Sequence, residues 1–173
     1  AASGYASAVV LASTNSALHN TGNGYAVIEI KGTTTNTIKL VKYTNGLAGT
    51  QTVLAAPTSD YLSTNTNWAS VKVVYNPTNH QWKLYLRSDG TTANSDFSSV
   101  TTQVGTTIAD SSYTKVACST FGFFFNHSAS ATPTSSTALF DNFNVTVSPP
   151  YTYQWTIPNL WSGSSSTSSI NIT

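Results

Sequence analysis

The chain has 173 residues and a formal net charge of +1, and only 8% of its residues are charged, against about a quarter in an average soluble protein. Its seven lysines and arginines are spread along the sequence, which argues against a nucleic-acid partner, and no stretch reaches the roughly 18 apolar residues that span a membrane. Because 39% of the residues are hydrophobic while Ser, Thr and Asn replace the missing charges, we expect a folded, secreted or cell-surface protein.

Helix signals are nearly absent, and apolar, β-branched and aromatic residues recur at every second position, which predicts an all-β fold. Turn residues separate these runs at intervals of about 8–12 residues, as in a two-sheet sandwich. In the first third of the chain we predict strands at residues 6–13, 25–31, 38–43 and 52–55. Between them we predict a turn at residues 22–24, a hairpin loop at residues 32–36 and a turn at Asn45-Gly46.

The clearest hairpin joins predicted strands at residues 68–75 and 81–87 through a turn that contains Pro77. In the first strand, alternation places Lys72 and Val74 on the face opposite to Val71, Val73 and Tyr75. In the second strand, we expect Trp82, Leu84 and Leu86 on the core face. The opposite face then carries Gln81, Lys83, Tyr85 and Arg87.

The last third of the first module is less regular. Residues 88–112 form a long polar stretch that four apolar residues are expected to pin partly to the sheet: Phe97, Val100, Val104 and Ile108. We predict a buried strand at residues 116–125, with Phe121, Phe123 and Phe125 on one face, and a last strand at residues 138–147. Pro149-Pro150 then breaks the pattern, which predicts a first domain at residues 1–148.

The sequence offers no catalytic residues, and we predict that the chain is not an enzyme. Glu29 is the only glutamate, and no second acid lies within two residues of it, so the paired carboxylates of a glycoside hydrolase are missing. No Gly-x-Ser-x-Gly motif, zinc-ligand cluster or phosphate-binding loop occurs. Glu29 is instead expected to pair with Lys39 or Lys42. The single cysteine, Cys118, excludes an intramolecular disulfide and is expected to be a small buried apolar residue.

Calcium is the one cofactor candidate, because it takes carboxylate, amide and carbonyl oxygens as ligands. Asp89, in a predicted loop at residues 88–90, and the pair Asp141-Asn142 offer such groups, although no Asp-x-Asp run joins them. The alternative for Asp141 and Asn142 is that they hydrogen-bond loop backbone where the last strand enters the sheet.

A sugar-binding site needs an exposed aromatic ring on which the sugar stacks, with polar groups beside it. The predicted ligand-binding residues are Trp68, Tyr85, Arg87 and Asn126. The two rings among them come from a wider aromatic set that also includes Tyr5, Tyr25, Tyr43, Tyr61, Trp82, Trp155 and Trp161. Trp68 stands at a strand start, where it either plugs the end of the sandwich or faces a ligand. Tyr85 is expected to be the exposed ring of its strand, although a tyrosine on a solvated strand face is also common.

Three sequence segments resemble a known family. They are residues 24–43, residues 71–85, with Val71-Lys72-Val73-Val74-Tyr75-Asn76-Pro77 before Trp82-Lys83-Leu84-Tyr85, and residues 121–145, with Leu139-Phe140-Asp141-Asn142-Phe143. In this order they resemble the laminin-G-like, concanavalin-type jelly-roll modules of secreted proteins from Bacteroidetes-type bacteria. The resemblance implies a two-sheet antiparallel jelly-roll sandwich. It also implies one or two further strands before Ala6, which a longer chain or another chain is expected to supply.

The tail resembles a different module. Tyr153-Gln154-Trp155-Thr156-Ile157-Pro158 and Ile170-Asn171-Ile172 look like the start of an immunoglobulin-like, PKD-like module, so residues 149–173 are expected to be a linker followed by that start, or added strands of the first domain. The resemblance implies a non-catalytic adhesion or structural module of a larger bacterial surface or filament protein. The alternative is a carbohydrate-binding, lectin-like domain of a secreted enzyme. The expected partners are glycans, other surface proteins, or further copies joined through open sheet edges.

Overall fold

The structure is a computed structural model, and it describes residues 7–31, 36–62, 67–126 and 138–146. Within these ranges the chain forms eight β-strands and no helix, which confirms the all-β prediction. In the same ranges there is accordingly no helix with the length and apolar character to cross a membrane. The strands are β1 (Ser7–Ser13), β2 (Asn23–Lys31), β3 (Asn36–Thr44), β4 (Thr50–Ala55), β5 (Trp68–Asn76), β6 (Gln81–Gly90), β7 (Gln103–Ala109) and β8 (Thr120–Phe125).

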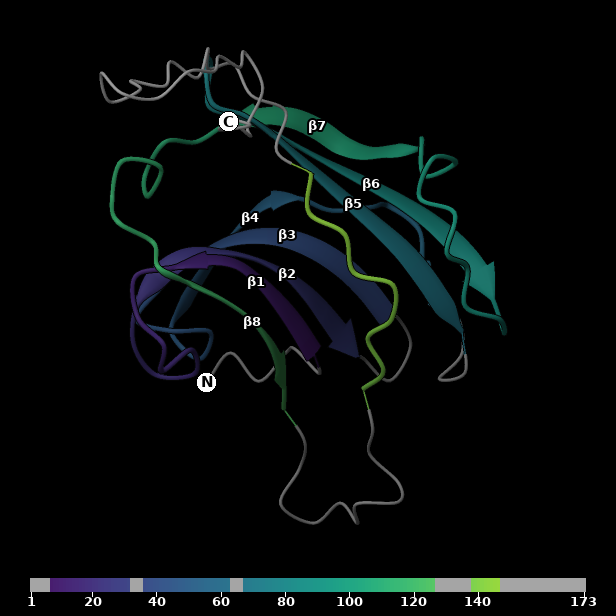
Figure 1. Cartoon of the computed structure of the whole chain (residues 1–173), viewed down its shortest axis with the longest axis horizontal. Coiled ribbons are helices and arrows are strands. Elements are labelled where there is room, and N and C mark those ends of the chain that lie inside the picture. Colours follow the sequence, from purple (N-terminus) through teal and green to yellow (C-terminus); the bar gives the residue numbers. More distant parts are fainter. Residues whose placement is uncertain (1–6, 32–35, 63–66, 127–137, 147–173) are drawn as a thin grey trace, which may run out of the picture. The chain divides into compact units, whose positions relative to one another are not determined.

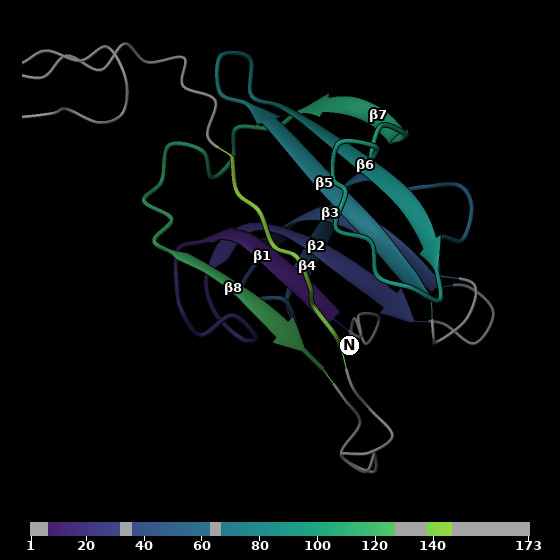
Figure 2. The same ribbon diagram turned by 45° about the vertical axis from the view of Figure 1, so that its right-hand side comes forward.

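The strands form two antiparallel sheets. The first has the order β4-β3-β2-β1-β8, and the second has the order β5-β6-β7. Figures 1 and 2 show them as two layers. The chain divides into two compact units, Ala1–Asp141 and Asn142–Thr173, and all eight strands lie in the first. The domain boundary predicted at residues 148–149 lies outside the described residues.

The two sheets share one apolar core, so the first unit is a β-sandwich. The five-stranded sheet contributes Tyr25, Val27 and Leu40 to this core, and the three-stranded sheet contributes Trp82 and Leu84. The layers meet directly, because the ring centroids of Tyr25 and Trp82 lie 4.3 Å apart. Alternation in the β5–β6 hairpin follows the prediction: Trp82 and Leu84 are buried, whereas Lys72 on the other face is exposed.

A second apolar cluster covers the outer face of the five-stranded sheet, and it includes Val10, Ala26, Ile28, Val41, Tyr43 and Leu47. The β1–β2 and β3–β4 connections come together beside it, where the Leu47 amide donates to the Leu18 carbonyl over 2.9 Å. The predicted turn at Asn45-Gly46 is the part of the β3–β4 connection that lies against the β1–β2 connection. Gly46 has a φ of +77°, and a Cβ at this position would lie 2.3 Å from the carbonyl oxygen of His19.

Two predicted turns are strands in the structure. Asn23 and Gly24, placed in a turn by their sequence, belong to β2, where Gly24 lies so close to β1 that a Cβ would come within 1.9 Å of the Ala12 carbonyl oxygen. Glycine therefore serves close packing at this position. The loop predicted at residues 88–90 is likewise the end of β6, since Gly90 pairs with Trp68.

The polar stretch at residues 88–112 contains strand β7, which the sequence did not predict. Only Val104 and Ile108 mark its inner face, opposite Leu84 and Trp82, while Ser and Thr fill its surroundings. The apolar alternation is therefore too sparse to separate this edge strand from a loop.

The strand predicted at residues 116–125 is shorter and more exposed than expected. It begins at Thr120, and Phe121 and Phe123 are 42% and 46% exposed. Phe123 of β8 lies opposite Val9 of β1. β8 is an edge strand of the five-stranded sheet, and the three-stranded layer does not fully cover it. The strand predicted at residues 138–147 is also wrong for residues 138–146, which form no ladder despite their alternating apolar residues.

The pairing predicted for Glu29 is wrong as well. Lys39 lies opposite Ile28 and therefore points to the other face of the sheet from Glu29, which accepts a hydrogen bond of 2.6 Å from the Ser7 hydroxyl. Lys42 instead forms an ion pair of 2.6 Å with Asp110.

Asp110 links the two sheets. Its carboxylate accepts hydrogen bonds from the Tyr25 hydroxyl at 2.7 Å and from Lys42 Nζ at 2.6 Å, both on the five-stranded sheet. Its backbone carbonyl accepts a bond of 3.1 Å from the indole of Trp82, and its amide donates to the His80 carbonyl, both on the three-stranded side. One residue after β7 thus bonds to both layers.

Burial alone would raise the pKa of Asp110, but the hydrogen bonds from Lys42 and Tyr25 outweigh it and lower this pKa from 3.8 to about 2. The same contact acts on Tyr25 in the opposite sense. Burial and the Asp110 carboxylate together raise the pKa of the Tyr25 hydroxyl, which therefore stays protonated and continues to donate.

The Asp110 link can be tested by acid titration. Because its folded pKa is depressed, ionised Asp110 stabilises the fold above the unfolded pKa, and this contribution is lost as the pH falls from about 4 to about 2. We expect Asp110→Asn to lower the free energy of unfolding by about 2 kcal/mol at pH 7. Denaturant unfolding from pH 2 to pH 7 measures both effects, and equal pH profiles for the wild type and the variant would contradict the link.

Candidate functional site

A pocket of about 190 Å³ lies between the connection that follows β4 and the chain leading into β7. Its lining residues come from these two segments: Pro57, Thr58, Ser59, Tyr61, Thr102, Gln103, Val104 and Gly105. Packing of β4 against β7 across the two sheets brings the segments together. The pocket is open to solvent along part of its wall.

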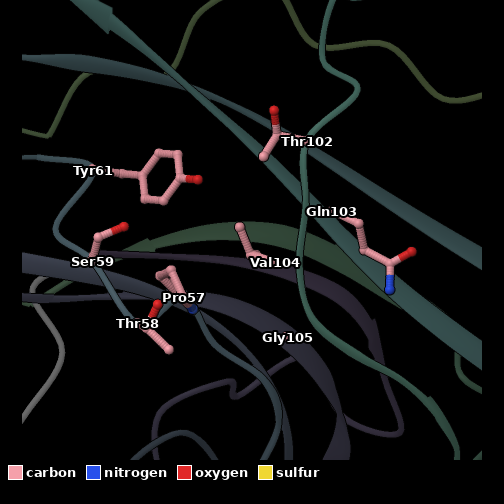
Figure 3. Close-up of a pocket in the computed structure, with 8 residues that line it drawn as sticks. All are labelled: Pro57, Thr58, Ser59, Tyr61, Thr102, Gln103, Val104 and Gly105. Atoms are coloured by element: carbon pink, nitrogen blue, oxygen red, sulfur yellow. The ribbon is translucent and has the colours of Figure 1, made fainter.

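Tyr61 is the aromatic residue of this pocket. Its half-buried ring packs against the shared core, and Figure 3 shows the ring pointing across the pocket toward β7. The hydroxyl of Ser59 lies on the same side as the ring, and Thr102 lies across from it (Figure 3). Gln103 extends on the far side of the β7 trace from Tyr61. One wall therefore offers a flat apolar ring with hydroxyl groups near it.

Glycine at position 105 lets β7 pass close to the residues that end β4 and follow it, on one side of the pocket. Gly105 has a φ of +68°, in the left-handed region that favours glycine. A Cβ there would lie 3.2 Å from the backbone nitrogen of Ala56 and 3.3 Å from the Ala55 side chain. The edge strand β7 can thus approach the end of β4 closely, which sets the width of the pocket.

The side chains that line this pocket are uncharged. None of the eight described lining residues carries a carboxylate, an imidazole, an amine or a thiol, so the pocket as described holds no general acid–base pair of the common kinds. An aromatic ring, hydroxyl groups and backbone amides suit a small, polar, uncharged ligand that has an apolar face. A pyranose sugar has both properties, since its C–H groups form one face and its hydroxyls point outward.

The predicted ligand-binding residues do not lie in this pocket. Trp68 is half-buried at the start of β5, Tyr85 lies on the outer face of β6, and Asn126 is exposed directly after β8. Arg87 donates from Nε to Asp89 at 2.5 Å and from Nη2 to the Ser70 hydroxyl at 2.8 Å. A ligand of Arg87 would have to compete with these internal partners, and the binding roles of all four residues stay predictions.

The predicted calcium ligands also have internal contacts or lie apart along the chain. The side chain of Asp89 is 3% exposed, and its second oxygen accepts a bond of 2.5 Å from Ser70. Asp141 ends the first compact unit, and Asn142, with a φ of 51°, begins the second. Within the described ranges no three His, Cys, Asp or Glu side chains gather in a metal-binding group. Calcium at Asp89, Asp141 and Asn142 stays a prediction.

Two other potentially reactive side chains, His80 and Cys118, are hydrogen-bonded within the fold. His80 Nδ1 lies 2.9 Å from the Tyr75 hydroxyl at the turn between β5 and β6. Cys118 is half-buried, its thiol donates to the Tyr113 carbonyl over 3.7 Å, and burial raises the pKa of the thiol, which makes the reactive thiolate scarcer.

Sequence reasoning placed Tyr61 in a wide aromatic set without choosing it. The opposite wall of the pocket was out of reach, because it belongs to the unpredicted strand β7. The available signal was local: Tyr61 follows the turn-forming residues Pro57, Thr58 and Ser59, which mark a surface loop that holds an aromatic ring.

Comparison with known proteins adds no relative: the chain matches no protein-family model, no curated protein and no solved structure. The resemblance to laminin-G-like modules therefore rests on the sequence segments quoted above.

The close approach at Gly105 can be measured against a matched position. Gly90 has the same φ of +68°, but a Cβ there would meet no atom within 4 Å. We expect Gly90→Ala to cost about 1 kcal/mol through backbone strain alone, and Gly105→Ala to cost more because it also crowds Ala56. Denaturant unfolding of both variants tests this, and equal losses would show that the pocket wall is not tightly packed at position 105.

Proposed function

We propose that this chain is a non-catalytic extracellular adhesion module that binds glycans, with an uncharged face of one sugar unit in the Tyr61 pocket. The observation that carries the proposal is a half-buried tyrosine ring facing a small pocket whose eight described lining residues are all uncharged. Charged ligands gain nothing from such a lining, whereas a sugar can stack on the ring and exchange hydrogen bonds with hydroxyls and backbone. The proposal keeps both sequence-based readings, a module of a surface or filament protein and a lectin-like domain of a secreted enzyme, because each can use this pocket.

The location outside the cell is part of the proposal. It is supported by the low charge, the abundance of Ser, Thr and Asn, and the likeness of the sequence to modules of secreted bacterial proteins. We further propose that the two sheets are the described part of a laminin-G-like jelly roll, followed by the start of a PKD-like module. In support, β8 returns from far along the chain to lie beside β1, as a long Greek-key connection does.

Self-assembly through sheet edges is a second candidate function. As far as the chain is described, neither sheet closes: β4 and β8 are the edges of one, and β5 and β7 are the edges of the other. An edge strand presents backbone groups to which another chain can add a strand. In this function the module would act as a spacer or a filament subunit.

The glycan proposal is tested by substitutions of Tyr61. We expect Tyr61→Leu, which keeps apolar bulk against the core but lacks a flat ring, to raise Kd for a bound neutral oligosaccharide by about tenfold or more. Tyr61→Phe keeps the ring and should bind within a few-fold of the wild type. A neutral glycan array identifies the probe, titration calorimetry gives Kd, and thermal unfolding checks that each variant is folded. Unchanged binding by a folded Tyr61→Leu variant would refute the pocket as the site.

The assembly candidate is tested by light scattering of the purified chain over a range of concentrations, with and without calcium. A pairing edge predicts a mass that rises with concentration as strands add to one another. A constant monomer mass under all conditions would exclude edge pairing and leave the glycan proposal as the function. A change with calcium would bring Asp89, Asp141 and Asn142 back as ligands, to be tested by their substitution.

A further inference from the structure

The outer face of the three-stranded sheet carries two lysines, Lys72 of β5 and Lys83 of β6, on either side of the β5–β6 turn. In the antiparallel register, Lys72 of β5 lies opposite Tyr85 of β6, and Tyr85 lies opposite Gln103 of β7. Lys83 is two residues from Tyr85 on the same strand and opposite the exposed Val74. These side chains point outward, because their neighbours Leu84 and Leu86 are fully buried on the other side.

The two lysines keep their charge available to a ligand. Lys72 Nζ lies 5.4 Å from the centroid of the Tyr85 ring, a cation–π contact that leaves its charge uncompensated. In the part of the chain that the structure describes, the ion pairs are Lys42–Asp110 and Arg87–Asp89, and neither involves Lys72 or Lys83. Asp89, the acid at the end of the same strand, is already held by Arg87 and Ser70. The face therefore carries a net positive charge around an aromatic ring.

The basic face ends beside the Tyr61 pocket, at Gln103, whose side chain extends on the far side of β7 from Tyr61 (Figure 3). Gln103 ends the transverse row from Lys72 through Tyr85 and also lines the pocket. Neighbouring strands lie about 4.8 Å apart, so the Cα atoms of Lys72 and Gln103 are separated by roughly 10 Å, within the span of a short oligosaccharide. A glycan with one unit in the pocket can thus extend over the row.

We propose that the bound glycan is acidic: a neutral face of one unit occupies the Tyr61 pocket, and carboxylates of neighbouring uronic-acid units pair with Lys72 and Lys83 beside Tyr85. This inference rests on the proposed function and names its ligand class. Charge complementarity selects the anion, and continuity through Gln103 selects a sugar chain over an isolated anion. The surface is exposed, so the charge contribution is modest and falls as salt screens it.

The probes are an oligogalacturonate and the same oligosaccharide with its carboxyl groups reduced to alcohols. We expect the wild type to bind the acidic form about tenfold more tightly at low salt, and the difference to shrink at 0.5 M salt. The double variant Lys72→Gln/Lys83→Gln should bind both forms with the Kd of the neutral one. Lys115→Gln, which removes an exposed cation elsewhere, is the matched control and should behave as the wild type.

The outcomes separate the two proposals. If folded Tyr61→Leu binds both probes as the wild type does, the pocket proposal fails and this inference falls with it. If neither probe binds the wild type, this inference fails, and the pocket proposal is still decided by the glycan that the array identifies. If both probes bind equally well, or if Lys115→Gln lowers acidic binding as much as the double variant, only the acidic inference fails. Equally tight binding of a double-stranded DNA oligomer at the same salt would also overturn it, because the face would then be an unselective cation surface. If a sulfated oligosaccharide without carboxylates binds more tightly than the oligogalacturonate, sulfate replaces carboxylate as the ligand group and the uronic-acid assignment is overturned.

Discussion

The contact between the two sheets at Tyr25, Trp82 and Asp110 is the interaction on which the rest of the structure depends. The closely packed, mutually tilted rings of Tyr25 and Trp82 bury apolar surface from both layers, and each ring carries a polar atom into that buried region. Such atoms are costly unless they are hydrogen-bonded. Asp110 satisfies both, the tyrosine through its carboxylate and the indole through its carbonyl. The polar link therefore makes the aromatic contact possible and fixes one position of the sheets relative to each other.

The candidate site follows from this arrangement. With the layers held together, β4 of one sheet and β7 of the other pack closely, and Gly105 permits their approach. The loop after β4 then places Tyr61 at the resulting pocket, with its ring supported from behind by the core. A ring held in this way loses little freedom when a ligand stacks on it, which favours binding by a small pocket.

The proposed functions use different properties of one scaffold. The pocket offers shape and an uncharged polar lining, the outer face of β5 and β6 offers positive charge, and the open sheet edges offer backbone pairing. The pocket and the basic face are connected through Gln103, so an acidic glycan can use both at once. Edge pairing is independent of them, and an adhesin can combine it with glycan binding.

Sequence patterns predicted the strands with a strong period of two, and they failed where the period is weak or where burial depends on distant residues. The β5–β6 hairpin was predicted with its two faces because Trp82, Leu84 and Leu86 alternate with charged and polar residues. Strand β7 was missed because only Val104 and Ile108 face the core. Phe121 and Phe123 alternate as well as any core strand, yet they are exposed, because an edge position, which no local pattern encodes, decides their burial.

The sequence by itself determined the fold class, the separation of polar and apolar faces in most strands, and the scarcity of catalytic groups, because these depend on composition and on neighbours along the chain. Only the tertiary structure decided which charges and rings meet. Lys42 pairs with Asp110, 68 residues away, rather than with Glu29 of the adjoining strand, and Tyr61 meets a wall built from β7. The predicted β5–β6 hairpin already placed Lys72 and Lys83 on its outer face, but only the pairing of β6 with β7 brings Gln103 of the pocket wall into line with them. The physical reason is that a binding site is a property of the packing between sheets, which the local pattern of a strand does not contain.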